Sequence, residues 1–242
     1  MKRRVVIVGA SSRTGRAIAA AIAEPECELV LGYFSGRDMA EACLQEVESK
    51  GGRATLAMLD LTCEDSIASF ARKLGSEPID ALIFAAGAYE EATLELTDMA
   101  LFVEQFKANA VGPALLTSAL KENLAASLLC DGAAVILFGD IHADLAPRAG
   151  AAAYLTSKAA THALVRLLAV ELAPTRVIGI APGVIAWPEN VPESEREAYL
   201  RRVPLSRSGS PSDAAQLAKA LAFETGYLTG VILPLDGGRH LR

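Results

Sequence analysis

The feature that most constrains the fold is a glycine-bracketed turn near the start of the chain. The apolar run Val5–Val8 leads directly into the sequence GASSRTGRAIA, in which Gly9 and Gly15 bracket the turn. The next segment, Arg16–Ala23, has helical spacing. A turn of this kind lets backbone N–H groups and a helix N-terminus approach a pyrophosphate. Its place between a strand and a helix therefore predicts a dinucleotide site within a βαβ unit.

Strand-like and helix-like segments alternate along the rest of the chain. This alternation predicts an α/β fold, a single-domain Rossmann-type doubly wound parallel sheet over residues 1–242 with helices on both faces. The expected strands are Val5–Val8, Leu29–Tyr33, Ala54–Leu59, Ala81–Phe84, Ala134–Phe138, Val177–Ile180 and Val231–Pro234. The expected helices are Arg16–Ala23, Met39–Ser49, Ser66–Leu74, Ala100–Leu128 and Ala151–Ala173. The polar, proline-containing stretch Trp187–Ser210 is too long for a plain connection, so we expect a lid there.

Composition and charge exclude several classes of protein. The net charge of −6 argues against nucleic-acid binding, which would show a basic face. No segment has the apolar length of a membrane span, and the run after MKRR is too short for a signal peptide. The four cysteines form no C-x-x-C pair and the three histidines are scattered, so we expect no metal site and buried free thiols in a cytoplasmic protein. These cysteines are Cys27, Cys43, Cys63 and Cys130.

The residues after the second expected strand bear on the choice of cofactor. An NAD-selective site usually carries an acidic residue at this strand end, where it holds the ribose diol. Here Ser35 and Arg37 follow Phe34, and Asp38 is interpreted as part of the next helix. With Arg13 of the glycine turn, Ser35 and Arg37 could hold a 2′-phosphate, which predicts NADPH.

Two further stretches carry candidate site residues. Asp60 and Leu61 follow the third expected strand and could flank an adenine, although Asp60 could equally cap a helix. Tyr154 and Lys158 are four residues apart, so they share one helix face. A nearby ammonium favours tyrosinate, so we expect Lys158 to lower the pKa of Tyr154 and suit it to proton transfer.

The chain resembles the short-chain dehydrogenase/reductase family from end to end. The shared motifs are GASSRTG, LDLT, FKANAVG, YLTSK, IAPG at Ile180–Gly183 and LDGG at Leu235–Gly238. The resemblance implies that Asn109 kinks a helix and supports a proton-relay water with Lys158. It also implies a homotetramer and an NADP site, whose candidate residues, with those argued above, are Gly9, Ser11, Arg13, Thr14, Gly15, Ser35, Arg37, Asp60, Leu61, Ala86, Lys158, Pro182 and Gly183.

The sequence departs from the common family pattern at three places. Phe84 and Ala85 replace both asparagines of the usual N-N-A-G motif, and Arg13 replaces the middle glycine of the turn. The usual catalytic serine is absent. Asp140 lies near its position, with one residue more than usual before Tyr154. A carboxylate would repel the oxyanion that develops in ketone reduction. It suits a substrate with N–H donors or a ring nitrogen that gains a proton, which favours reduction of a C=N bond in a heterocycle.

At the positions where the chain departs from the common pattern, it resembles one branch of the family, the pteridine reductases, which includes the bacterial dihydromonapterin reductases. The chain shares with it the turn arginine, the D-I-H-A run after the fifth strand, the run APGVIAWPE and the ending GGRHLR. The resemblance implies catalytic residues Asp140, Tyr154, Lys158 and Asn109. Pterin would contact Arg13, Tyr89, Asp140, Tyr154 and Trp187, with Tyr89 stacked on its ring. His142 is interpreted as a supporting or surface residue, and the ending as a solvated tail or a tail docked at a tetramer interface.

Two other functions remain open from the sequence. The first is a carbonyl or 3-oxoacyl thioester reductase. This function is favoured if the extra residue before Tyr154 turns Asp140 away from the site and brings Ile141 to the serine position. The second is a non-catalytic NADP-binding sensor, suggested by the loss of both asparagines at Phe84 and Ala85. We expect an enzyme because Asn109, Tyr154 and Lys158 are all present, a combination that a non-catalyst does not need. The residues that favour a pterin reductase are Arg13, Tyr89, Asp140 and the run at Trp187.

Overall fold

A computed structural model describes residues 2–188 and 191–242. Its central sheet has seven strands in the order β3-β2-β1-β4-β5-β6-β7, and every neighbouring pair is parallel. The order reverses beside β1, so the switch point of the doubly wound sheet lies between β1 and β4. The strands are β1 Arg3–Val8, β2 Cys27–Tyr33, β3 Arg53–Met58, β4 Ala81–Phe84, β5 Ala134–Phe138, β6 Arg176–Pro182 and β7 Ile232–Leu235.

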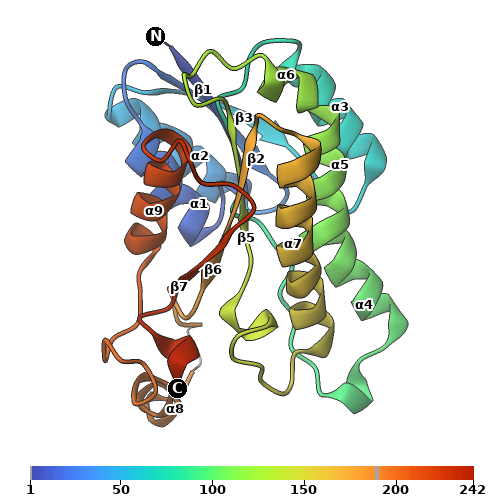
Figure 1. Ribbon diagram of the computed structural model, residues 1–242, viewed down its shortest axis with the longest axis vertical. Helices are drawn as coiled ribbons and strands as arrows, with labels where there is room; N and C mark the ends of the chain where they lie inside the picture. Colours follow the sequence, from blue (N-terminus) through green and yellow to red (C-terminus); the bar gives the residue numbers. More distant parts are fainter. Residues whose placement is uncertain (1, 189–190) are drawn as a thin grey trace.

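Helices cover both faces of this sheet (Figure 1). One face carries α1 Arg13–Ile22, α2 Arg37–Ser49 and α9 Pro211–Phe223. The other carries α3 Glu64–Leu74, α4 Met99–Phe106, α5 Gly112–Ala119, α6 Lys121–Ala125 and α7 Ala152–Glu171. The remaining helix, α8 Glu193–Leu200, lies beyond the carboxyl ends of the strands, near the C-terminus. The expected α/β architecture is therefore confirmed.

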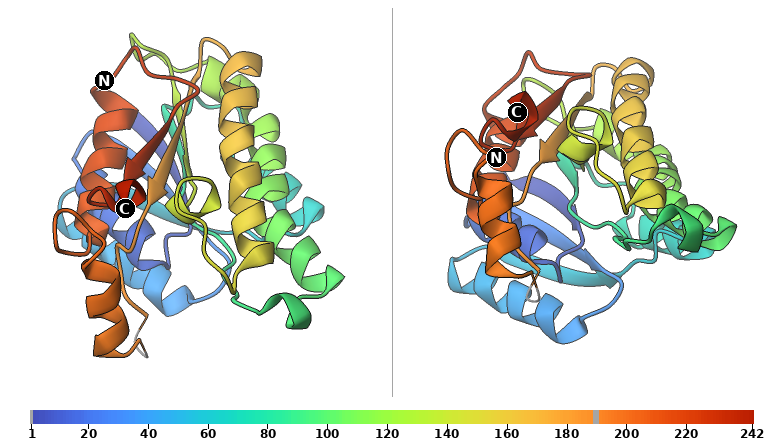
Figure 2. Two further views of the ribbon diagram at one scale, coloured as in Figure 1. Left: turned by 60° about the horizontal axis from the view of Figure 1, so that its bottom comes forward. Right: turned by 90° about the horizontal axis from the view of Figure 1, so that it is seen from below.

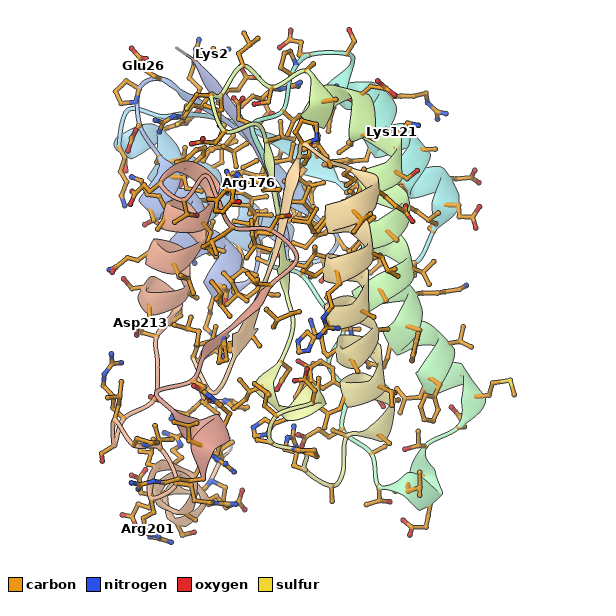
Figure 3. The ribbon with its side chains drawn as sticks, in the orientation of Figure 1. Lys2, Glu26, Lys121, Arg176, Arg201 and Asp213 are labelled. Carbon is orange, nitrogen blue, oxygen red and sulfur yellow. The ribbon has the colours of Figure 1, made fainter. Side chains whose placement is uncertain are left out.

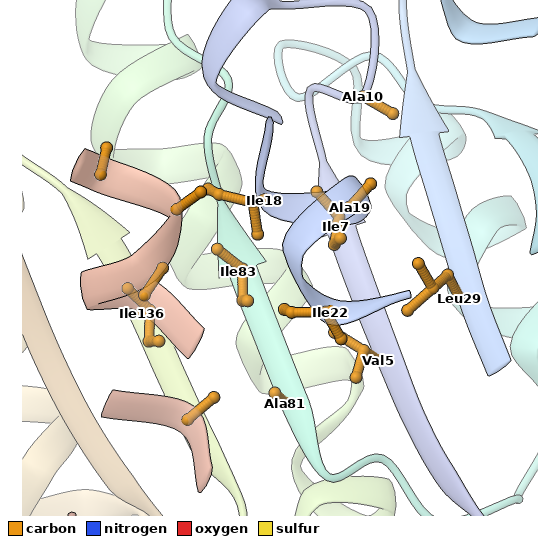
Figure 4. Close-up of a cluster of buried hydrophobic side chains, with 14 of the residues drawn as sticks. Val5, Ile7, Ala10, Ile18, Ala19, Ile22, Leu29, Ala81, Ile83 and Ile136 are labelled. Carbon is orange, nitrogen blue, oxygen red and sulfur yellow. The ribbon is translucent and has the colours of Figure 1, made fainter. Parts of the chain in front are cut away.

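The core forms two layers because each strand alternates its side chains between the two faces. On the α1 side, Ile7, Ile18 and Ile83 pack in one buried cluster (Figure 4). On the α7 side, Val6, Leu82 and their neighbours form the second cluster with residues from α3, α5 and α7. Both clusters hold the strands rigidly, so the loops at their carboxyl ends start from fixed positions.

Several segments differ from the sequence-based expectation. The expected helix Ala100–Leu128 is divided into α4, a π-helical turn over Lys107–Val111, α5 and α6. Helix α9 was not expected, although Ser210 caps its N-terminus and Pro211 occupies its first turn, which are ordinary helix-start signals. The expected lid contains α8, and its residues 189 and 190 lie outside the described part of the chain.

The prediction of buried thiols is correct for Cys27 and Cys43 and wrong for the other two cysteines. Cys63 is exposed because it is the N-cap residue of α3, and Cys130 is exposed because it lies in the loop before β5. All four thiols are free.

Candidate active site

The glycine turn, as expected, joins the end of β1 to the start of α1. Ser12 caps the helix by accepting a hydrogen bond from the Gly15 N–H at 2.9 Å. Gly9 has a φ of 95°, and a Cβ on it would lie 2.6 Å from the Ala86 nitrogen. A Cβ on Gly15 would lie 2.1 Å from the Gly9 carbonyl oxygen. A side chain at position 9 would push the turn away from the end of β4, and a side chain at position 15 would force the turn itself open.

The predicted cofactor residues gather at one end of the sheet. They follow the carboxyl ends of strands or begin the helices after them, and Figure 2 shows this end from below. Ser11 and Thr14 lie in the β1–α1 turn, Ala86 follows β4, and Pro182 and Gly183 stand at the end of β6. In doubly wound sheets this end is where nucleotides bind, so the placement fits a dinucleotide.

The residues expected to bind a 2′-phosphate are exposed at this same end. Ser35 and Arg37 follow β2, and Arg37 forms an ion pair with Glu41 at 2.8 Å. Arg13 donates a hydrogen bond to the Trp187 carbonyl oxygen at 3.1 Å, which ties the glycine turn to the segment after β6. Asp38 lies in the first turn of α2, as expected.

The alternative of Asp60 as a helix cap is wrong, because Cys63 is the N-cap residue of α3. Asp60 instead closes a turn by accepting from the Thr62 N–H at 2.8 Å and from its hydroxyl at 2.7 Å. Leu61, the other residue predicted to flank an adenine, is buried against Gly112 of α5.

Asp140 and Tyr154 meet directly. The Tyr154 hydroxyl donates to Asp140 Oδ2 at 3.1 Å, while Asp140 Oδ1 accepts from the His142 N–H at 2.8 Å. Asp140 thereby caps the short 3-10 turn Ile141–Ala143. Ile141 is fully buried, and its side chain has no donor that could replace the serine hydroxyl. The extra residue before Tyr154 has therefore not turned the carboxylate away.

The pKa of Tyr154 is raised, whereas the sequence predicted a lowered value. Burial raises the pKa of Tyr154 well above its ordinary range, and the charge of the adjacent Asp140 raises it further. Lys158 has its ammonium 5.8 Å from the Tyr154 ring centre, and burial lowers the pKa of Lys158 to about 8. In this site Tyr154 therefore keeps its proton near neutral pH and can donate it, because burial and the adjacent carboxylate both disfavour the phenolate.

Lys158 and Asn109 face a common space beside β4. Lys158 donates to the Phe138 carbonyl oxygen at 2.7 Å, and Asn109 donates to Ser157 at 2.9 Å. The Asn109 Oδ1 atom is buried and has no hydrogen-bond partner among the described residues. A Cβ on Gly87 would lie 2.7 Å from this oxygen and 3.2 Å from the lysine nitrogen. An unpartnered buried acceptor beside an ammonium is where a bound water or a ligand hydroxyl would fit.

Tyr89 lies at the mouth of the site and is half exposed. Its ring meets the Tyr154 ring edge-on, with centroids 4.8 Å apart. Its hydroxyl contacts Glu91 and accepts from Arg148 at 3.1 Å, and Arg148 pairs with Glu91. These contacts join the loop after β4 to the loop before α7.

A second aromatic group flanks the site. The Trp187 ring lies edge-on to Tyr199 of α8 at 5.5 Å, and Arg196 lies over Trp187. Arg239 lies over Tyr199 and is buried, so the reading of the ending as a solvated tail is wrong for this residue. His142 is buried with its Nδ1 bound to the Ala146 carbonyl oxygen, which agrees with a supporting role.

Sequence reasoning missed His162, which is buried next to Asp140. Its Nε2 lies 3.3 Å from the Asp140 nitrogen, and its Nδ1 lies 3.1 Å from Asp144 Oδ2. A signal was available, because Tyr154, Lys158 and His162 follow one another at intervals of four residues and so share a helix face.

A cavity of about 480 Å³ lies at the other end of the sheet, where β1, β2 and β4 begin. Figure 3 labels Lys2 and Glu26 at that end, opposite Arg201. Charged side chains in its lining pair with one another, as Lys2 does with Glu28 and Arg3 with Glu24. The cavity lies away from Tyr154 and is not the candidate site.

Comparison with known proteins gives the family. The family model described as enoyl-(acyl carrier protein) reductase matches residues 9–240. The chain belongs to the short-chain dehydrogenase/reductase family. A dehydrogenase/reductase structure from Sinorhizobium meliloti 1021 superposes with a TM-score of 0.88 at 30% identity, covering 98% of this chain and 94% of that one.

Two curated relatives of this short-chain dehydrogenase/reductase have names that describe oxidoreductases. An uncharacterized oxidoreductase of Methylorubrum extorquens is 30% identical, with 96% of both chains covered. The 3-oxoacyl-[acyl-carrier-protein] reductase FabG of Thermotoga maritima is 29% identical, again with 96% of both covered. The chain is therefore an oxidoreductase of this family, whose members bind NAD(P). No helix within the described residues is long and apolar enough to cross a membrane.

Proposed function

We propose that the protein is an NADPH-dependent reductase that converts 7,8-dihydropterins to tetrahydropterins and also accepts dihydrofolate. The observation that carries the proposal is the 3.1 Å hydrogen bond from the Tyr154 hydroxyl to Asp140 Oδ2. A carboxylate at this point disfavours a developing ketone oxyanion. It favours a heterocycle that presents N–H donors and gains a proton on nitrogen.

The chemistry of the reduction matches the two side chains. NADPH, when bound, would supply the hydride for the carbon of the C=N bond, and Tyr154 could supply the proton for the adjacent ring nitrogen. The raised pKa of Tyr154 keeps its hydroxyl protonated at neutral pH, so the phenol is available as the acid. Asp140 holds that hydroxyl and can accept a hydrogen bond from a pterin N–H group.

The choice of NADPH rests on cations at the cofactor end. Arg37 is exposed after β2, with Ser35 beside it, and no carboxylate stands at the tip of that strand. Arg13 lies in the glycine turn. Guanidinium groups bind phosphate through paired charge-assisted hydrogen bonds, which favours a cofactor with a 2′-phosphate.

The substrate would lie between the aromatic groups at the mouth of the site. Tyr89 offers a flat, half-exposed ring next to Tyr154, which suits stacking on a pterin. Trp187 lies on the segment after β6 and accepts a hydrogen bond from Arg13 of the glycine turn through its carbonyl oxygen, so the two residues would border the pterin from that side. We propose Trp187–Ser210 as the lid that closes over it.

A carbonyl or 3-oxoacyl thioester reductase is the second candidate. The 29% identity to the Thermotoga maritima 3-oxoacyl-[acyl-carrier-protein] reductase favours it. Against it, the serine hydroxyl that would bind the carbonyl oxygen is absent, and the buried Ile141 cannot replace it. The names of the relatives give no support to a non-catalytic sensor.

We also propose a cytoplasmic homotetramer, as the family resemblance implies. Exposed apolar side chains on α4, α5 and α7, among them Met99, Val103, Leu115 and Val170, are the surface that association would bury. Sedimentation of the purified protein at several concentrations tests the tetramer.

The function is tested by measuring NADPH oxidation with four substrates. These are 7,8-dihydromonapterin, 7,8-dihydrobiopterin, dihydrofolate and a 3-oxoacyl thioester. Fast turnover of at least one pterin or folate, with little on the thioester, is expected. Fast turnover of the 3-oxoacyl thioester, with little on the pterins and dihydrofolate, would support a carbonyl or thioester reductase and refute the pterin assignment.

A further inference from the structure

His162 is a buried imidazole that the proposed reaction does not use. It lies on α7 one turn after Lys158 and is 2% exposed. Both ring nitrogens have partners: the Asp140 main-chain nitrogen lies 3.3 Å from Nε2, and Asp144 Oδ2 lies 3.1 Å from Nδ1. The ring therefore connects the exposed carboxylate of Asp144 to the backbone of the residue that holds the Tyr154 hydroxyl.

The two partners fix the tautomer of this ring. The Asp140 N–H can only donate, so Nε2 must carry a lone pair. The Asp144 carboxylate can only accept, so Nδ1 must carry the hydrogen. Only the neutral Nδ1–H form satisfies both contacts. An imidazolium would place an N–H at Nε2 opposite the Asp140 N–H and would break that bond.

The backbone beside Asp140 is shaped to admit the ring. A Cβ on Gly139 would lie 2.0 Å from His162 Nε2 and 2.5 Å from its Cδ2. A side chain at position 139 would thus displace the imidazole. The Gly139 N–H also donates to the Ile180 carbonyl oxygen at 2.7 Å, which fixes the end of β5 against β6. The ring therefore packs directly against the main chain of residues 139 and 140.

We propose that His162, oriented by Asp144, is a positioning residue for Asp140. With the N–H of Asp140 held by His162 and Oδ1 held by the His142 N–H, the carboxylate has only Oδ2 left to meet Tyr154. Loss of the imidazole acceptor frees the main chain at Asp140 and lets Oδ2 move off the phenol. The kinetic side of this proposal rests on the proposed function of Asp140.

Paired substitutions separate positioning from mere filling of space. His162→Leu removes the acceptor, whereas His162→Gln retains an amide oxygen that can reach the Asp140 N–H. We expect His162→Leu to lower kcat for the preferred pterin by roughly 10- to 100-fold, since small displacements of reacting groups have effects of that size. His162→Gln should stay within about threefold of the unmodified protein, and NADPH affinity should be unchanged in both.

Asp144 offers a matched pair on the other side of the ring. Asp144→Asn keeps an oxygen for the Nδ1–H and should retain kcat, whereas Asp144→Ala should lose part of it. Equal kcat in His162→Leu and His162→Gln would overturn the proposal. The proposal would also be overturned if kcat fell in both His162 variants only in step with their thermal stability and NADPH binding.

A spectroscopic measurement tests the same inference without any substrate. In protein labelled with ¹⁵N-histidine, the His162 ring at pH 7 should show a protonated Nδ1 and an unprotonated Nε2. The resonance is assigned by its absence from the His162→Gln spectrum. In uniformly ¹⁵N-labelled protein, the His162 Nε2 should also couple to the Asp140 amide nitrogen across the hydrogen bond. A protonated Nε2 would refute the inference. If the protein reduces no pterin, the proposed function fails while this result still stands or falls independently.

Discussion

The hydroxyl of Tyr154 donates a hydrogen bond to Asp140 Oδ2 across 3.1 Å, between the start of α7 and the loop after β5. The bond joins a phenol whose pKa is raised by burial to an acceptor that cannot bind a carbonyl oxygen. This pairing distinguishes the site from one built to reduce ketones.

Substitution of Asp140 should change the substrate preference. We expect Asp140→Ala to lower kcat/KM for dihydropterins by roughly 10²- to 10⁴-fold, the usual contribution of a group in acid–base catalysis. Asp140→Ser should restore a hydroxyl donor and raise turnover of the 3-oxoacyl thioester relative to the pterin. Steady-state kinetics on both substrates measures this, with Tyr154→Phe as the inactive reference. Unchanged pterin turnover in Asp140→Ala, with none in Tyr154→Phe, would show that the carboxylate has no role.

Lys158 should lower the stability of the cofactor-free protein at neutral pH. Burial lowers the pKa of Lys158 from 10.5 to about 8, so below pH 8 the folded state holds an ammonium that water would solvate better. Between pH 8 and 10.5 the unfolded chain binds more protons than the folded chain, so stability rises with pH in that window. The difference between the pKa values of Lys158 in the unfolded and the folded chain corresponds to about 3 kcal/mol of destabilisation at neutral pH.

Lys158→Met should therefore raise the free energy of unfolding at pH 7 by about 2 kcal/mol, because the lost hydrogen bond to Phe138 offsets part of the gain. The gain should shrink towards pH 10, and catalytic activity should be lost. Urea unfolding measures the free energy of unfolding at pH 7 and at pH 10. Lys121→Met, at an exposed lysine, is the control and should leave the free energy of unfolding unchanged at both pH values. A stability gain that is the same at both pH values would contradict the assigned cause.

Arg37 should determine cofactor preference. Removing one charge-assisted phosphate contact should raise the Kd for NADPH by roughly 10- to 100-fold in Arg37→Ala and leave the Kd for NADH unchanged. Fluorescence titration with each cofactor measures the two constants. Arg53→Ala, at the opposite end of the sheet where β3 begins, is the matched control. Equal weakening of both cofactors would mean that Arg37 does not contact a 2′-phosphate.

Tyr89 should act through its ring and not through its hydroxyl. Tyr89→Phe loses the contacts with Glu91 and Arg148 but keeps the flat surface, so KM for the pterin should stay within about threefold. Tyr89→Ala should raise that KM by roughly tenfold. Initial-rate measurements with the 3-oxoacyl thioester alongside the pterin provide the control. A rise of the same size in Tyr89→Phe would assign the effect to the hydroxyl network.

Local patterns predicted the strands well. The expected bounds of β4, Ala81–Phe84, and β5, Ala134–Phe138, are those observed, because strands buried on both faces of a parallel sheet are short apolar runs rich in branched and aromatic residues. The π-helical turn around Asn109 could not be read from helical periodicity, since an inserted residue leaves the apolar pattern on either side intact. Exposure of Cys63 and Cys130 likewise depends on where their loops lie.

The sequence by itself determined the βαβ architecture, the glycine turn and the spacing that places Tyr154 and Lys158 on one face of α7. Each of these depends on residues close in the chain, whose backbone geometry is local. Only the tertiary structure decided that Asp140 faces Tyr154 and that the pKa of Tyr154 rises. The first depends on how the loop after β5 packs against the start of α7, because Asp140 and Tyr154 lie on different elements. The second depends on desolvation, which exists only once α7 is packed against the sheet.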